Sequence, residues 1–523
     1  MKRIYTYMRF AMASVFLMLA ASSCLEKYPS SAIPEGQAMQ TLNDAEQHVN
    51  GIYASLKSSY LFSGLLTLLP DIQSDLVYAV EGNSNTYGNF WRWRIRSTDS
   101  EIEGVYGSLY EVIGNCNFYL DKVDEVMDRL TDDDEIDMLE IYTGEVYAIR
   151  ALCYSELLKC YCKAYDPATA GNTPGVVLRS RYFEKEPVVR ATLKDSYDFV
   201  LADLERAEAR LSDDDADNPY SPVFFTLSAA RALHARVALY MQDWETAIKY
   251  STGLIERSSC FALSSVRTEL YDSSVGEYVN SFDYMWAHDV GTEVIWMIGF
   301  TATSYGGALG QVFLNFTSDY TYFYPDYVPA QWVIDSFDSG DERDDAYFAG
   351  RSQGIVIGYS NGMDWPLLVK YYGNRSLIDY YIFHVSMPKP FRLAEQYLIR
   401  AEAYCRTGQY GRAGADLSAL RAARYYSGGS VSVNEGNWLK TIADERMKEL
   451  YMEGFRLHDL KRWGEEYAAL NGGVLFTRTP QNFSQSEGST LSVPPGAPML
   501  VWPIPQHELE APGAALEPND SNN

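Results

Sequence analysis

The sequence lacks an excess of basic residues, because 43 lysines and arginines stand against 70 aspartates and glutamates and give a net charge of −27. Three of the basic residues lie before residue 10, so the rest of the chain carries a net charge of about −30. This charge argues against nucleic acid as a partner. It also argues against binding of polyanions through a general basic surface.

The sequence also lacks an apolar run of about 20 residues, the length needed to span a bilayer. One shorter apolar run, Phe10–Ala21, follows a basic start and precedes Ser-Ser-Cys. This order predicts a lipoprotein signal over residues 1–23, with acylation of Cys24. An uncleaved membrane anchor is the alternative, and the short run disfavours it. Residues 24–40 contain proline and glycine and are predicted to form a tether.

Cysteine and histidine are scarce, with 7 and 6 residues. The cysteines form no paired CxxC motif, and the spacing of Cys160 and Cys162 suits opposite sides of a helix, which disfavours zinc. The sequence contains no GxSxG, HExxH, P-loop or GxGxxG motif. We therefore predict no metal, no cofactor and no catalytic residues.

Helical periodicity is the main positive signal. It predicts helices over 41–57, 105–129, 144–165, 194–211, 226–240 and 245–255, and a helical hairpin over 391–426. We interpret the region from 57 to about 100, and the acidic run Thr131–Asp137, as loops. Two hairpins share a small residue nine positions before an aromatic residue and an alanine three after it: Ala235, Trp244 and Ala247 in one, and Ala401, Tyr410 and Ala413 in the other. This repeat is typical of tetratricopeptide-like packing.

Between residues 261 and 390 the helical period fades, and Gly, Tyr, Ser and Asp accumulate. Short apolar runs at Val294–Ile298 and Gly354–Gly358 are candidates for short strands. We predict a long insertion between helical repeats. Long loops on a rigid scaffold are where binding usually takes place.

Aromatic residues are abundant, with 41 Tyr, 22 Phe and 10 Trp. Those outside the helical patterns fall in three clusters: Tyr87, Phe90, Trp91 and Trp93; Tyr284, Trp286 and Tyr305; Tyr320, Tyr322, Tyr324 and Tyr327. Flat rings with polar edges suit stacking on sugar faces. Alternatively, each cluster is a small core beneath a long loop.

The stretch 90–96, FWRWRIR, alternates strictly and predicts an extended strand. Trp91, Trp93 and Ile95 would then face one way, and the arginines the other. The Trp face could be buried against helices, or Trp91 or Trp93 could form an open sugar platform with an arginine as hydrogen-bond donor. The sequence leaves both interpretations open.

The stretch 445–463 contains Glu445, Glu449 and Glu453 at helical spacing. Carboxyls on one helix face cannot flank a glycosidic bond from opposite sides, as a glycosidase requires. We therefore predict structural ion pairs, including Glu453 with Arg456 and Asp459 with Arg462.

Three motifs stand out along the chain: NGIY at 50–53, the charged signature at 445–463, and WPIP with Glu508 near the end. Together they resemble the RagB/SusD family, the lipid-anchored nutrient-binding proteins of Bacteroidetes. The resemblance implies a mainly α fold, with a tetratricopeptide-like scaffold and a long insertion of loops and short strands. It divides the mature chain into a helical part at 41–260, a loop-rich insertion at 261–390 and signature helices with a closing segment at 391–523.

The resemblance also implies a function. The protein would be an outer-membrane lipoprotein facing the exterior, held to the membrane by its N-terminal lipid alone, and it would pass glycans to a SusC-like TonB-dependent transporter without catalysis. The expected ligand-binding residues are Tyr87, Trp91, Arg92, Trp93, Trp286, Tyr320, Tyr322 and Tyr324. Binding of peptides or other nutrients is the alternative on the same fold, and a surface glycoside hydrolase is a less favoured one.

Overall fold

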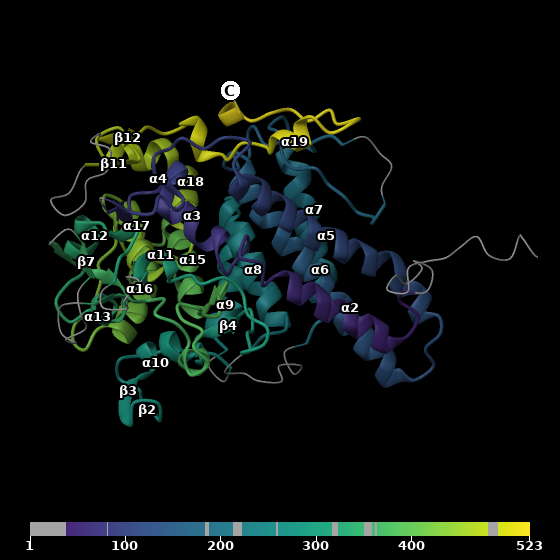
Figure 1. Ribbon diagram of the computed structural model, residues 1–523, viewed down its shortest axis with the longest axis horizontal. Helices are drawn as coiled ribbons and strands as arrows, with labels where there is room; N and C mark the ends of the chain where they lie inside the picture. Colours follow the sequence, from purple (N-terminus) through teal and green to yellow (C-terminus); the bar gives the residue numbers. More distant parts are fainter. Residues whose placement is uncertain are drawn as a thin grey trace, which may run out of the picture.

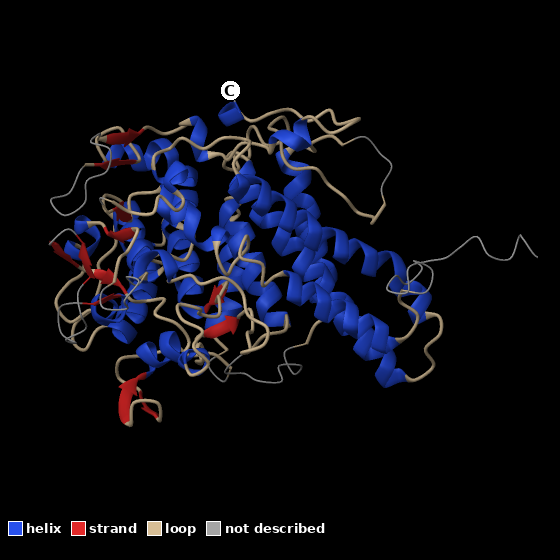
Figure 2. Cartoon of the chain, in the orientation of Figure 1, coloured by secondary structure: helices blue, strands red, loops and turns tan. Residues whose placement is uncertain are grey.

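The computed structural model describes residues 38–80, 82–183, 188–212, 222–257, 260–315, 323–349, 358–360, 363–479 and 490–522. Helices dominate this part of the chain, and its short strands form two-stranded pairs (Figure 2). The prediction of a mainly α fold with an irregular insertion is confirmed. Within the described residues, no helix combines the length and apolar character that crossing a membrane requires.

The longer helices lie in a row, each beside the next. In order they are α2 (Leu42–Ser55), α5 (Ser100–Met127), α6 (Asp133–Tyr161), α7 (Leu193–Glu208), α8 (Leu227–Tyr240), α9 (Trp244–Ile255), α15 (Leu393–Arg406) and α16 (Tyr410–Arg424). Figure 1 shows α2, α5, α6 and α7 together at one end of the molecule. The hairpins α8–α9 and α15–α16 pack through fully buried small residues, Ala235, Ala247, Ala401 and Ala413. Helix α9 therefore contacts α15 directly, although the insertion separates them in sequence.

Two loop predictions are wrong. The acidic run begins α6, because Asp132 caps the helix by accepting from the backbone N–H of Asp134 at 3.0 Å, and acidic residues favour a helix N-terminus. Within the region 57–100, α3 (Leu65–Gln73) is buried on every side. All nine of its residues are buried, the polar Thr67, Asp71 and Gln73 among them, so the helix has no exposed polar face opposite an apolar one and the pattern gave no clear signal.

The insertion consists of short elements. They are β2 (Glu269–Asp272), β3 (Glu277–Asn280), α10 (Ser281–His288), β4 (Val294–Trp296), α11 (Gln311–Leu314), β5 (Tyr327–Pro329), α12 (Gln331–Asp335), α13 (Glu342–Tyr347), β6 (Phe348–Ala349), β7 (Gly358–Ser360), β8 (Met363–Trp365), β9 (Leu367–Leu368) and α14 (Arg375–Ile378). The antiparallel strand pairs are β1 (Val77–Ala79) with β5, β4 with β10 (Phe391–Arg392), β2 with β3, β6 with β9, and β7 with β8. The strand predicted at Val294–Ile298 is confirmed by β4. Of residues 354–358 only Gly358 is described, as the start of β7.

The signature stretch is broken into α17 (Trp438–Glu449) and α18 (Arg456–Leu470). Gly454 in the break has φ +83°, and a Cβ there would lie 2.6 Å from the carbonyl oxygen of Leu66. The close approach of α3 therefore requires glycine. Because Glu453 also lies in the break, the prediction that it shares one helix face with Glu445 and Glu449 is wrong. The chain closes with β11 (Phe476–Arg478), β12 (Leu491–Val493) and α19 (Gln506–Leu509).

A buried network of charges joins the insertion to the signature helices. Its members are the cations Arg343, Lys370, Arg392, Arg421 and Arg424 and the carboxylates Glu293, Asp341, Glu445, Glu449 and Glu453. The prediction that Glu445, Glu449 and Glu453 form structural ion pairs is thus confirmed. The predicted Asp459–Arg462 pair is confirmed too, at 2.9 Å. The predicted partner of Glu453 is wrong: Arg456 pairs with Asp75 at 2.9 Å, and Glu453 binds Arg392 at 2.6 Å.

Candidate functional site

A cavity of about 450 Å³ lies in the insertion, beside the β2–β3 hairpin, α10 and α14. The hairpin projects from the body of the molecule next to α10 (Figure 1). The volume falls within the range of small-molecule sites, about 300–1,000 Å³. The residues that line the cavity are Asp272, Val275, Glu277, Val279, Asp283, Trp286, Ala287, Asp345, Ala346, Val369, Lys370, Tyr372, Gly373 and Arg375.

The hairpin turns one face toward the cavity. Strand pairing places Asp272 opposite Glu277 and Tyr271 opposite Tyr278. Because side chains alternate along a strand, these two pairs lie on opposite faces. Glu277 and Val279 line the cavity. Tyr271 and Tyr278 form an exposed ring pair on the other face, with centroids 5.4 Å apart.

Asp272 holds the hairpin to its neighbours. His288 Nε2 lies 2.9 Å from its carboxylate, the Ser274 hydroxyl donates to it at 2.6 Å, and Arg375 Nη1 lies 3.5 Å away. Burial opposes ionisation of Asp272, but the hydrogen bonds from His288 and Ser274 outweigh it and lower its pKa to about 2. The carboxylate is therefore charged at neutral pH and fixes the position of Arg375 on the cavity wall.

Trp286 on α10 forms part of the cavity wall and is 6% exposed. Lys370 Nζ lies 4.2 Å from its ring centroid, a cation–π contact. The same Nζ donates to Glu453 Oε1 at 2.7 Å, and burial lowers the pKa of Lys370 to about 8 against the opposing effect of Glu453. The indole N–H of Trp286 has no hydrogen-bond partner among the described residues. A buried donor of this kind gains most from a ligand that accepts from it.

Asp283 lies on the same wall. Asn280 Nδ2 donates both to Asp283 Oδ2 at 3.0 Å and to Glu342 Oε1 at 2.9 Å, so the two carboxyls share one donor. Burial, and then the charge of Glu342, raise the pKa of Asp283 to about 8. The Asp283 carboxyl is therefore largely protonated at neutral pH, and it adds a hydrogen-bond donor to the cavity.

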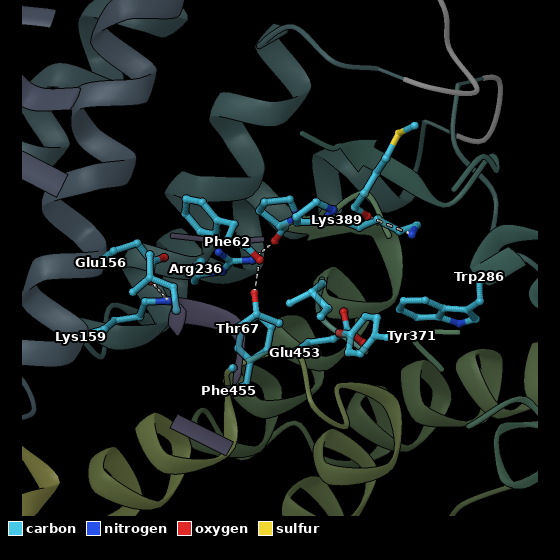
Figure 3. Close-up of a pocket in the computed structure, with 16 residues that line it drawn as sticks. Phe62, Thr67, Glu156, Lys159, Arg236, Trp286, Tyr371, Lys389, Glu453 and Phe455 are labelled. Carbon is cyan, nitrogen blue, oxygen red and sulfur yellow. Dashed lines mark hydrogen bonds and ion pairs between the residues drawn. The ribbon is translucent and has the colours of Figure 1, made fainter. Parts of the chain in front are cut away.

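A second cavity, of about 40 Å³, also has Trp286 in its lining (Figure 3). Its polar lining includes the ion pair Glu156–Lys159 at 2.7 Å and the hydroxyl of Thr67, which donates to the Phe62 carbonyl at 2.6 Å. The volume suits a few waters and excludes a sugar ring. The larger cavity is therefore the candidate ligand site.

The strand predicted at residues 90–96 is wrong. The chain forms α4 (Gly88–Trp91) and then a turn in which Trp93 has φ 57°. Each indole N–H finds a backbone carbonyl, Trp91 at Val77 (3.3 Å) and Trp93 at Gln73 (2.7 Å). These bonds fix the two rings in separate clusters, so the alternation in the sequence does not reflect an extended backbone.

The structure does not bring the predicted ligand-binding residues together in one site. Trp91 is 7% exposed and packs on Tyr78, which favours the buried interpretation. Trp93 is half-buried against Phe476, and Arg92 binds Asn85 at 2.5 Å.

Trp286 alone among the described candidates lines the 450 Å³ cavity. Tyr87 is half-buried with a left-handed backbone, and the Tyr324 hydroxyl donates to Gly82 at 3.1 Å. Tyr320, Tyr322 and Cys24 lie outside the described residues, and their predicted roles stay predictions.

Sequence reasoning missed most of the cavity wall. Glu277, Asp283, Tyr372 and Arg375 were not among the candidates. A signal for the hairpin exists in ELYD and EYVN on either side of a Ser-Ser-Val-Gly turn. Nothing local indicates that α14, about a hundred residues later, closes the cavity. Within the described residues, no group of three or more His, Cys, Asp or Glu could hold a metal ion.

Two family models match the chain. The SusD family model covers residues 384–517, and a SusD-like model described as "Starch-binding associating with outer membrane" covers residues 25–239. Relatives from Formosa agariphila include SusD-like protein P38, at 22% identity over 86% of this chain and 89% of the relative. SusD-like protein P25 is 24% identical with the same coverage of both chains.

Solved structures share the fold. A SusD superfamily protein from Bacteroides thetaiotaomicron superimposes with a TM-score of 0.73 at 20% identity, over 92% of this chain and 99% of the other. A SusD-like carbohydrate binding protein from Bacteroides vulgatus gives 0.69 at 20% identity, over 91% and 98%. The N-terminal helices, the signature segment and the overall architecture all lead to one assignment: the chain belongs to the SusD/RagB family.

Proposed function

We propose that this protein binds carbohydrate at the cell surface, captures oligosaccharide or polysaccharide, and passes it on without breaking bonds. The observation that carries the proposal is the 450 Å³ cavity, which combines aromatic and hydrogen-bonding side chains in a SusD/RagB chain. One matching family model is described as starch-binding, and one structural relative as carbohydrate binding.

The cavity offers the groups that sugar recognition uses. Tyr372 at its rim is 43% exposed, and its flat ring suits stacking on a sugar face. Arg375 and the indole N–H of Trp286 supply donors, and Glu277 supplies an acceptor. Arg375 is held by Asp272 and Ser274, so the donor is already oriented before a ligand arrives.

Delivery requires a partner and an anchor. We propose that Cys24 carries the lipid, that the protein faces the exterior of the outer membrane, and that the helical scaffold docks on a SusC-like TonB-dependent transporter. The family assignment and the signal-like N-terminus support this arrangement. Extraction in mild detergent should co-purify a much larger second chain. Repeated recovery of the lipoprotein alone would contradict the partnership.

Binding is tested with Tyr372→Ala. Loss of an exposed stacking ring should weaken glycan affinity by about 1–3 kcal/mol with little change in melting temperature. The control is Tyr182→Ala, because Tyr182 is 40% exposed but follows α6 in the helical part. Affinity electrophoresis on a polysaccharide panel gives the glycan affinity, and calorimetry gives the melting temperature.

Two further assays test the alternative functions. A reducing-sugar assay checks for hydrolysis of the polysaccharide, and a peptide panel checks for binding of peptides. If Tyr372→Ala and Tyr182→Ala bound glycan equally well, the proposed site would be refuted. If the wild type retained no glycan, the proposed function would be refuted.

A further inference from the structure

We propose that the 450 Å³ cavity takes a sugar residue that carries no anionic group, and that it rejects uronate and sulfated sugars. This inference rests on the proposed function and names its ligand class. It follows from which charges in the cavity are already neutralised and which remain free.

Both cations of the cavity wall are neutralised by groups of the protein. Lys370 Nζ lies 2.7 Å from Glu453 Oε1 and also donates to the Tyr451 carbonyl at 2.7 Å. Arg375 lies 3.5 Å from Asp272 and donates to Ser274 at 2.9 Å. An incoming anion would have to compete with these contacts, so neither side chain offers an unpaired positive charge.

The free charge in the cavity is negative. Glu277 on β3 faces the cavity opposite Asp272, and no described side chain forms an ion pair or a hydrogen bond with it. Asp283 is largely protonated at neutral pH and adds little charge, but its Oδ1 has no hydrogen-bond partner among the described residues. A carboxylate or sulfate on the ligand would lie close to the Glu277 carboxylate, and the two like charges would repel each other.

The same groups suit uncharged sugars. The carboxylate of Glu277 accepts hydrogen bonds from hydroxyls, and the Asp283 carboxyl both accepts and, when protonated, donates them. The indole N–H of Trp286, buried and without a partner, needs an acceptor such as a hydroxyl or ring oxygen. The cavity therefore presents donors and acceptors for hydroxyl groups together with a net negative charge.

The test compares polysaccharides that differ in charge but share a backbone. The probes are polygalacturonate against its methyl ester and carboxymethyl cellulose against hydroxyethyl cellulose, beside a panel of neutral polysaccharides and their sulfated forms. Affinity electrophoresis should show at least tenfold weaker retention of each anionic form than of its neutral counterpart. The difference in retention between anionic and neutral forms should become smaller as the salt concentration is raised, because salt screens the repulsion.

Two charge reversals locate the effect. Glu277→Lys should reduce the discrimination against anionic forms several-fold. Glu269→Lys on the same hairpin should not, because Glu269 is exposed on the opposite face, paired with Asn280. Equal or tighter retention of anionic forms by the wild type, or equal effects of the two variants, would overturn the charge selection while leaving glycan binding intact. Retention of no glycan at all would overturn the proposed function and the charge selection with it.

Discussion

The ammonium group of Lys370 lies 4.2 Å from the ring centroid of Trp286 and 2.7 Å from Glu453 Oε1. One side chain thus connects the wall of the candidate site to the break between α17 and α18. Because Glu453 also binds Arg392 at 2.6 Å, the cavity wall is continuous with the buried charge network. The signature segment therefore supports the wall of the candidate site from behind, and none of its residues lines the 450 Å³ cavity.

Glu449 is the centre of that network, and Glu449→Gln should destabilise the protein strongly. Its carboxylate lies 2.8 Å from Arg424, 2.9 Å from Arg392 and 3.2 Å from Arg343. Removing one charge from a buried set leaves the opposite charges uncompensated, at a cost of about 3–5 kcal/mol in the free energy of unfolding. Denaturant unfolding measures this cost.

The matched control is Glu466→Gln. Glu466 pairs with Arg406, but its side chain is 45% exposed, so the loss should be about 0–1 kcal/mol. If the two variants lost the same stability, the network would not support the fold as we describe.

Trp91→Ala should reduce stability, with no direct effect on the ligand site. Trp91 is 7% exposed and lies outside the cavity, so truncation should cost about 3–5 kcal/mol of folding free energy. Trp93→Ala should cost less, because Trp93 is half-buried. Melting temperature and glycan affinity are both measured. A Trp91→Ala variant with normal melting and lost affinity would instead support the sugar platform.

The sequence was sufficient for the helices whose apolar residues recur on one face. Leu42–Ser55, Leu193–Glu208 and Leu227–Tyr240 each begin at a threonine cap and agree with the predicted ranges within a few residues. The closely packed hairpins were also predictable, because small residues at fixed spacing serve one purpose, the close approach of helices. The loss of helical period between residues 261 and 390 also predicted the long insertion and its place between repeats.

The site was largely unpredictable for a physical reason. Its wall brings Glu277, Trp286, Lys370 and Arg375 together through contacts between short elements far apart in sequence. Short strands and four-residue helices carry no usable period. The stretch 90–96 shows the opposite error, since its alternation is real but Trp93 adopts a left-handed turn. Hydrogen bonds to Val77 and Gln73 decided the conformation there, and no local pattern encodes them.

Cys24→Ala should release the protein from the membrane. The expectation rests on the signal-like order of basic start, short apolar run and small residues before Cys24. Two acyl chains hold a protein stably on a bilayer, whereas one binds marginally. Fractionation in a strain without the transporter provides the measurement, and Cys260→Ala, at an exposed cysteine elsewhere, serves as the control. Continued recovery of Cys24→Ala in the outer-membrane fraction would show that the tether is assigned wrongly.

The last prediction concerns pH. Burial and the nearby charge of Glu342 raise the pKa of Asp283 to about 8, whereas an unfolded chain releases this proton near pH 4. The folded state therefore keeps a proton that the unfolded state has lost, and the free energy of unfolding should fall as pH rises from about 4 to about 8. Above pH 8 the contribution of Asp283 should level off. The groups facing Asp283 are Asn280, Glu342 and Asp345.

Asp283→Asn isolates this effect, because the amide keeps an acceptor for Asn280 and never ionises. Relative to the wild type, the variant should gain stability with rising pH, by about 3–4 kcal/mol between pH 5 and pH 8. Burial also raises the pKa of Asp71 to about 7, so the unfolding free energy of both proteins falls further with rising pH. The test is therefore the difference in unfolding free energy between variant and wild type at each pH. Urea unfolding at several pH values gives the curves. An Asp283→Asn difference that is independent of pH would show that Asp283 is already ionised at neutral pH in the folded protein.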